Sequence, residues 1–240
     1  MKKLTKEQIE ELEMFDTPTV CNALETFHCR SRVEGYMKPG MILRTPAGKP
    51  MVGYAATAKA GGRFPRPDAH QKLMEYYGHV RGMADPTIAV VQDIDKEPAA
   101  AFWGEVQATV HKSIGCVGTL TDGGVRDIKE AGELGFQFFS TSVEVAHGYT
   151  HVVECGCPVS ILGLDIYPGD LLHADIHGVV KIPHEIAPVL AEACRRAAAA
   201  ELPMLEPCRK AIAEGRKPTI EELDSWRNDM TEARKQAEKQ

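Results

Sequence analysis

The chain has 240 residues, 43% of them apolar and 26% charged, which is enough for one substantial hydrophobic core. Its formal net charge of −6 argues against a protein that binds nucleic acid by neutralising phosphates. No apolar run reaches the length of a membrane span and the first residues lack a signal-peptide pattern, so the expected location is the cytoplasm, without a membrane partner.

The N-terminal half is expected to alternate helices with strands. Thr5 and Gln8 have the spacing of a capping box, and Pro18 is expected to divide the first apolar pattern into two helices. Apolar and β-branched runs predict strands, whereas paired glycines and alternating prolines predict a loop. The expected elements are two helices within 5–27, a strand at 51–60, a loop at 61–67, a helix at 69–82 and a strand at 87–92.

The second half contains a strand, turn, helix and strand, a βαβ pattern that normally gives parallel strands. Asp127 is expected to cap the helix of this unit, and Trp103, Val106 and Val110 are expected on one side of the helix that precedes it. The expected elements are helices at 102–113, 128–134 and 184–201, strands at 116–120, 136–142, 159–164, 171–174 and 179–182, and turns at 122–124, 167–170 and 175–178.

These elements predict one α/β domain with mixed strands, and the turn at 175–178 is expected to close a hairpin. The stretch 208–240 is highly charged and has few large apolar side chains. It is therefore expected to form a packing arm or a frayed helix rather than a domain.

The seven cysteines and nine histidines follow neither a zinc nor a disulfide pattern. Cys155 and Cys157 are the one close pair, and a single intervening residue makes a poor zinc knuckle. Reduced thiols, and no zinc site, are expected.

A glycine-rich segment combines an acid, a guanidinium and a second acid. Glu105 and Arg126 have twenty residues between them, and Asp127 follows Arg126 directly. The turn from Thr121 to Asp127 leaves the C-terminal end of a predicted parallel strand, where ligands of open α/β sheets usually lie. Its two adjacent glycines let a ligand approach the backbone.

These residue types suit a small 2-oxo acid beside a divalent cation. The planar fork of Arg126 can bind a carboxylate, and Asp127 is a hard oxygen donor for Mg²⁺ or Mn²⁺. Glu105 lies near the start of a predicted helix, so the backbone N–H groups of Val106 and Gln107 can face an anion. The plainer alternative is a capping aspartate, a solvated glutamate and an ordinary turn.

Other residues stay open as minor candidates. Two loop arginines can bind a second carboxylate or be solvated, and a histidine and an aspartate beside a turn can touch a site or only be hydrogen-bonded. Three lysines stay open for Schiff-base chemistry. These residues are Arg63, Arg66, His173, Asp175, Lys59, Lys112 and Lys181.

The segments 103–105 and 118–127, with 168–175 and 178–183, resemble the regulator-of-RNase-activity-A-like (RraA-like) family over about residues 15–200. That family includes 4-hydroxy-4-methyl-2-oxoglutarate aldolases with oxaloacetate decarboxylase activity. A signature of this branch is an acidic residue that is followed, after twenty residues, by Arg-Asp. The chain departs from the family at Asn22, where an aspartate is expected, and in its charged tail.

The resemblance implies a compact α/β/β/α sandwich of the swivelling β/β/α type, with mixed parallel and antiparallel strands. The implied catalytic domain covers 1–207, and the helical extension covers 208–240. The family assembles as homotrimers or homohexamers with sites near subunit interfaces. It also uses an acid from the C-terminal region of a neighbouring subunit, for which Glu201 is a positional guess.

The resemblance also implies a role for each residue of the glycine-rich segment. Asp127 would bind the metal, Mg²⁺ or Mn²⁺, and Arg126 would bind the pyruvyl carboxylate and carbonyl oxygen. Glu105 would hold or orient a metal-bound water. The backbone that would line the substrate carboxylate comprises Gly104, Glu105, Val106 and Gln107.

The implied activity is that of a class II pyruvate lyase, which breaks the C3–C4 bond of a 2-oxo acid and stabilises a pyruvate enolate. Both aldol cleavage and oxaloacetate decarboxylation fit this description. The alternatives are a non-catalytic protein-binding regulator of a ribonuclease, and a lyase or hydratase for another 2-oxo acid. A methyltransferase is not supported, because the sequence lacks a glycine-rich strand-to-helix motif for S-adenosylmethionine.

Overall fold

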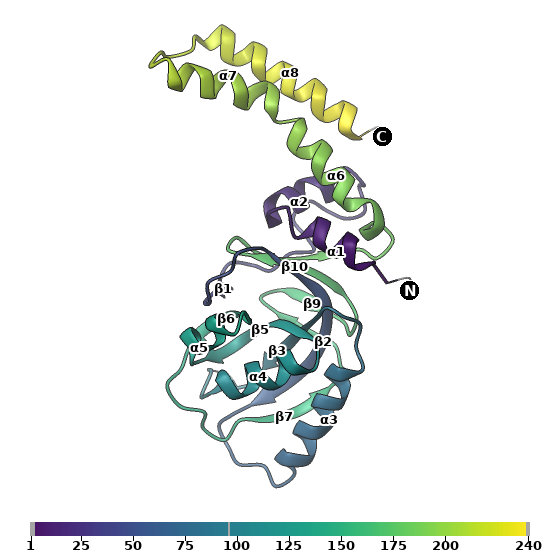
Figure 1. The fold of residues 1–240 in the computed structure, drawn as a ribbon, viewed down its shortest axis with the longest axis vertical. Helices are drawn as coiled ribbons and strands as arrows, with labels where there is room; N and C mark the ends of the chain where they lie inside the picture. The colour runs from purple at the N-terminus through teal and green to yellow at the C-terminus, as the bar shows by residue number, and fades with distance from the viewer. Residues whose placement is uncertain (1–2, 96, 239–240) are drawn as a thin grey trace.

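The computed structural model describes residues 3–95 and 97–238, which form an α/β body and a projecting pair of helices (Figure 1). A mixed sheet runs through the body. Helices α1, α2 and α6 gather at one end of it, and α7 and α8 extend beyond them. The predicted α/β class with mixed strands is confirmed.

The main sheet has the strand order β1-β6-β5-β3-β2-β10-β11, with β4 paired to β5 and β7 paired to β2. The pairs β2–β3, β3–β5, β4–β5 and β5–β6 are parallel, and the remaining pairs are antiparallel. The strands are β1 Ile42–Leu43, β2 Met51–Gly61, β3 Thr87–Asp93, β4 Ala101–Trp103, β5 Cys116–Val125, β6 Gln137–Val143, β7 His151–Cys155, β10 Leu171–Asp175 and β11 Gly178–Ile182.

Each face of this sheet is covered by different elements, because side chains alternate along a strand. Ala89 and Val91 of β3 face helices α3 Ala69–Arg81, α4 Glu105–Ser113 and α5 Ile128–Glu133. Ile88 and Val90 face the opposite side, where a second small sheet of β8 Val159–Ile161 and β9 Leu164–Ile166 packs. A third apolar cluster joins the β2–β10–β11 end to α1 Lys6–Leu12, α2 Thr17–Glu25 and α6 Ala187–Ala199.

Several local predictions are confirmed. The Thr5 hydroxyl accepts from the Gln8 N–H at 3.3 Å and the Gln8 side chain accepts from the Thr5 N–H at 3.0 Å, which completes the capping box of α1. Asp16 caps α2, which has Pro18 in its first turn. The β5–α5–β6 unit is parallel as expected, and β10 and β11 form the predicted hairpin.

Three predictions were wrong. The helix expected from residue 102 begins at Glu105, because Ala101–Trp103 pairs with β5 as a strand. The apolar side expected to include Val106 is not the buried one: Val106 is 73% exposed, and the helix buries Ala108 and His111. The strand expected at 116–120 continues to Val125, so the predicted turn at 122–124 is a bulged part of β5. The strand expected at 159–164 is a hairpin, and the sequence pattern missed β1, β4 and β7.

The charged C-terminal stretch is helical. Helices α7 Leu202–Ala213 and α8 Ile220–Glu238 form a hairpin, and the end of α8 returns to α6 (Figure 1). α7 runs through position 207, and the division into a domain and an extension at this position stays a prediction. Among the described residues, no helix is both long and apolar enough to cross a membrane.

Candidate active site

The structure brings Arg126 and Asp127, at the end of β5, against the first turn of α4. One Asp127 carboxylate oxygen, Oδ2, accepts the backbone N–H of Glu105 at 3.0 Å, and Arg126 Nε lies 3.7 Å from the same oxygen. The Arg126 N–H donates to the Trp103 carbonyl at 2.9 Å, which holds the chain beside the end of β4. Residues separated by twenty positions in the sequence therefore form one cluster.

Gly104 is the reason that this approach is possible. A Cβ at position 104 would lie 2.5 Å from Asp127 Oδ2 and 3.2 Å from Arg126 Cγ. Both distances are shorter than ordinary contacts, so only glycine fits without a shift.

The expectation that Asp127 caps its own helix is wrong. Asp127 occupies the N-cap position of α5, but its φ of 52° and ψ of 43° are left-handed and its side chain makes no capping bond there. Asp is among the residues that tolerate this conformation. The side chain caps α4 instead, and a carboxylate at that position is favoured by the helix dipole.

The cluster is open to a ligand. The side chains of Arg126 and Asp127 are 36% and 38% exposed, and Glu105 and Val106 are exposed at the helix start. The Glu105 carboxylate makes no hydrogen bond or ion pair with any residue of the described ranges. The cluster therefore offers a guanidinium fork, two carboxylates and backbone N–H groups.

These donors fit a hard cation rather than zinc. Carboxylate oxygen is the ligand that Mg²⁺ and Mn²⁺ prefer, and Mg²⁺ usually keeps several waters beside one or two protein carboxylates. Within the part of the chain that the structure describes, no group of three or more histidine, cysteine, aspartate and glutamate side chains converges. Cys155 and Cys157 pack in two different apolar clusters and do not share a site.

A second pair of acids, which the sequence pattern did not predict, lies along the same edge of the sheet. Asp122 Oδ1 accepts the N–H of Asp93 at 2.6 Å. Burial raises the pKa of Asp122 to about 6 and also raises that of Asp93. The only sequence signal was an acid at or near the end of each of two adjacent parallel strands.

The first turn of α4 is held from beneath by aromatic residues. The Tyr77 hydroxyl of α3 donates to the Gln107 side-chain oxygen at 2.9 Å, and His111 Nδ1 donates to the Gln107 carbonyl at 2.7 Å. Burial lowers the pKa of His111 to about 4, so its ring is neutral at neutral pH. Trp103 is fully buried against His111, with ring centroids 4.5 Å apart.

The histidine and aspartate at the hairpin, His173 and Asp175, have structural partners. His173 is fully buried between the Thr17 hydroxyl, at 2.9 Å, and the Leu12 carbonyl, at 3.2 Å. Asp175 accepts the Thr17 N–H at 2.8 Å. Both residues join the first two helices to β10.

The remaining minor candidates also have partners outside the cluster. Arg63 donates to the Glu97 carbonyl, and Arg66 is paired with Asp68. The three lysines contact other groups: Lys59 lies 3.8 Å from Glu154, Lys112 donates to the Gly135 carbonyl and Lys181 lies 3.1 Å from Asp170.

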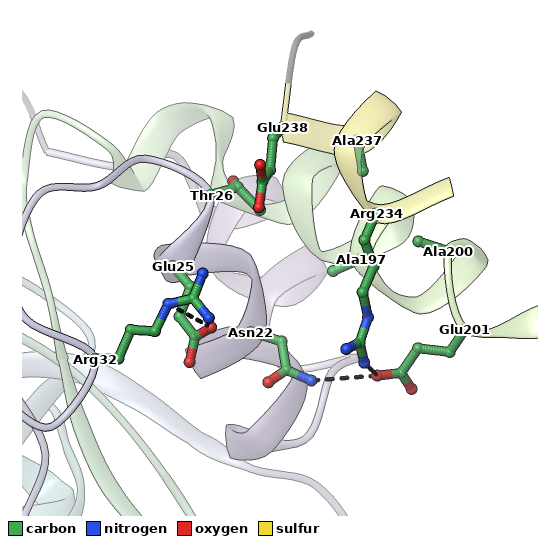
Figure 2. A pocket seen from close by; sticks show the side chains of 10 residues that line it. All are labelled: Asn22, Glu25, Thr26, Arg32, Ala197, Ala200, Glu201, Arg234, Ala237 and Glu238. Carbon is green, nitrogen blue, oxygen red and sulfur yellow. Dashed lines mark hydrogen bonds and ion pairs between the residues drawn. The ribbon is translucent and has the colours of Figure 1, made fainter. Parts of the chain in front are cut away.

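Glu201 lies in a different place. It is the N-cap residue of α7, its carboxylate is 2.9 Å from Arg234 of α8, and the Asn22 amide donates to it at 3.5 Å. Figure 2 shows these three side chains around a pocket of about 110 Å³ between α2, α6 and α8. Within one chain, helices α2, α6 and α8 lie away from α4, beyond the other end of the main sheet's β2 and β10 (Figure 1).

The sequence model of the family described as RraA-like, Aldolase/RraA, matches residues 17–181. Among curated proteins, the chain is 32% identical over 101 residues to a "Putative 4-hydroxy-4-methyl-2-oxoglutarate aldolase" of Halalkalibacterium halodurans. This match covers 42% of the chain and 48% of that relative. The chain is also 30% identical over 98 residues to Protein DlpA of Legionella pneumophila, and this match covers 40% of the chain and 16% of that protein. The matches thus span less than half of each curated relative.

Two solved structures show the same fold. An uncharacterised protein from Pseudomonas syringae superposes with a TM-score of 0.70 at 22% identity, over 94% of this chain and 95% of that one. RraAS2 of Streptomyces coelicolor, described as an unusual member of the RNase ES inhibitor RraA family, gives 0.66 at 20% identity, over 84% and 96%.

Proposed function

The chain belongs to the RraA-like family, Aldolase/RraA, and from this premise we propose that it is a metal-dependent pyruvate lyase that cleaves the C3–C4 bond of a 2-oxo acid. The observation that carries the proposal is the cluster of Glu105, Arg126 and Asp127 at the start of α4. A protein-binding regulator would not need an exposed Arg-Asp pair held against the helix start that carries Glu105. This arrangement supports the enzyme, either as a 4-hydroxy-4-methyl-2-oxoglutarate-type aldolase or as an oxaloacetate decarboxylase.

The positive groups of the cluster suit the anionic end of a 2-oxo acid. The Arg126 guanidinium and the N–H groups of Gly104, Val106 and Gln107 would bind the substrate carboxylate and carbonyl oxygen, since the Glu105 N–H is already donated to Asp127. They would also face the negative charge that grows on the enolate oxygen as the C3–C4 bond breaks. Donors that are already fixed by the fold stabilise this charge without reorganising.

Asp127 would hold the Mg²⁺ or Mn²⁺ ion, and the Glu105 N–H orients its carboxylate. The bound ion supplies a Lewis acid for the enolate. Glu105, which has no described partner, would act through a water as the base that removes the hydroxyl proton in aldol cleavage; decarboxylation needs no such base. We further propose that the protein acts in the cytoplasm as a homotrimer or homohexamer. In this assembly Glu201 of one subunit would contribute to the site of a neighbouring subunit.

Pyruvate release from oxaloacetate tests this function directly. We expect Mg²⁺-dependent release that EDTA abolishes, and a loss of at least about a hundredfold in kcat/KM in Arg126→Ala, because the variant lacks the charge that faces the enolate. Arg227→Ala, which removes an exposed arginine of α8, is the matched control and should keep its activity. Turnover that is independent of metal, or undiminished in Arg126→Ala, would refute the proposal.

A further inference from the structure

We propose that Tyr77 is a positioning residue that orients the Gln107 carboxamide so that its NH₂ group binds the carboxylate of the 2-oxo acid. This inference rests on the proposed function. It adds a polar side chain to a site that otherwise binds the substrate anion through Arg126 and backbone N–H groups.

The position of Gln107 on α4 places it beside the cluster. Gly104, Gln107 and His111 are spaced by three and four residues and therefore lie on one side of the helix. Gly104 is the point at which Arg126 and Asp127 approach this side. Side chains of a helix lean toward its N-terminus, so the Gln107 carboxamide extends toward the same end as Asp127.

The bond from Tyr77 determines which end of the carboxamide is available. The Tyr77 hydroxyl donates to Gln107 Oε1 at 2.9 Å, so the oxygen is occupied and the two N–H donors of Nε2 point elsewhere. Burial raises the pKa of Tyr77, so the phenol keeps its proton at neutral pH and remains a donor. An amide held in this orientation presents donors to an anion, whereas a freely rotating amide also presents its oxygen.

Tyr77 is itself held in place. Its ring lies edge-on to His111 with centroids 5.4 Å apart, and His111 donates to the Gln107 carbonyl. Gln107 is therefore fixed at both its backbone and its side chain. Fixed donors bind an anion more tightly because less rotamer entropy is lost on binding.

The test is a double-mutant cycle on oxalate, an analogue of the pyruvate enolate, measured by calorimetry with Mg²⁺ present. We expect Gln107→Met to weaken oxalate binding about tenfold, the size of one hydrogen bond to an anion, and Tyr77→Phe about fivefold, because the released amide can also turn its oxygen toward the anion. The double variant should match Gln107→Met alone, because Tyr77 acts through Gln107. In oxaloacetate turnover the KM should rise by similar factors while kcat changes less than twofold.

Tyr149→Phe is the matched control, because Tyr149 is 59% exposed and its hydroxyl has no hydrogen bond to a described residue. Oxalate affinity that is unchanged in Tyr77→Phe, or additive losses in the double variant, would overturn the inference, whether or not the thermal midpoint falls. If the wild-type protein neither binds oxalate nor releases pyruvate, the proposed function itself fails, which is a different result.

Discussion

At the scale of single residues, the candidate site depends on the absence of a side chain. Gly104 has a φ of −156°, which any residue can adopt, so glycine is not needed for its backbone conformation. It is needed because its lack of a Cβ leaves room for Asp127 and Arg126. Arg126, Asp127 and Glu105 could be predicted as candidates because their chemistry is visible in their residue types. The steric requirement at Gly104 could not be predicted, since it appears only when β5 and α4 are placed together.

We predict that Gly104→Ala impairs the site while the fold is retained. The new methyl group would displace Asp127 and Arg126, so Mn²⁺ affinity, measured by paramagnetic relaxation of water protons, should fall about tenfold. Gly48→Ala is the control, since nothing lies within 4 Å of a Cβ at position 48. Unchanged Mn²⁺ affinity in Gly104→Ala would show that Asp127 does not hold the ion in this orientation.

At the scale of elements, the helices were easier to predict than the ends of the strands. The capping residues Thr5 and Asp16 act on their own helices, so local sequence was sufficient. Residues 122–124 read as a turn because Asp-Gly-Gly is a turn sequence, but pairing with β6 and β4 keeps them in the strand. Tertiary pairing thus overrode local preference, and the isolated sequence does not contain that information.

The first two helices are joined to β10 through His173, and this contact should make stability depend on pH. Burial lowers the pKa of His173, so below about pH 6.5 the unfolded chain takes up a proton that the folded chain excludes. The free energy of unfolding therefore decreases as the pH falls below about 6.5. His173→Leu should cost about 2–4 kcal/mol at pH 8, because the Thr17 hydroxyl and Leu12 carbonyl lose their partner.

Urea unfolding at pH 8 and pH 5 would measure this difference. The difference in the free energy of unfolding between wild type and His173→Leu should be smaller at pH 5 than at pH 8. The reason is that only the wild type has this buried histidine to protonate. His147→Ala, at an exposed histidine, should leave the pH dependence unchanged. A gap that is constant or widens at pH 5 would contradict the assignment.

At the scale of the whole molecule, the described residues form a body and a helical hairpin, and a small polar cluster lies where α8 returns to the body. Arg234 of α8 contacts Glu201, which Asn22 of α2 also contacts (Figure 2). The sequence predicted that the tail would be helical but gave no sign of where it would dock. One contact at this docking site is the long-range ion pair between Arg234 and Glu201, and a single ion pair leaves no periodic pattern in the sequence.

Arg234→Ala should loosen α8 without altering the body. A partly exposed ion pair contributes about 0.2–1 kcal/mol, so amide hydrogen exchange across residues 220–238 should accelerate about two- to fivefold, while β2 and β3 exchange as before. Arg227→Ala, at an exposed position of the same helix, serves as the control. Equal exchange in both variants would show that the cluster does not hold α8.

The path of the chain between Glu105 and Arg126 explains why the number of residues between them matters. α4 carries the backbone away from the cluster, a bend at Ile114 and Gly115 reverses it, and β5 brings it back. The length of this interval must therefore bring Arg126 back to the point where α4 starts. An insertion within β5 would turn every later side chain to the opposite face before Arg126 is reached, whereas one at the distant bend can be absorbed.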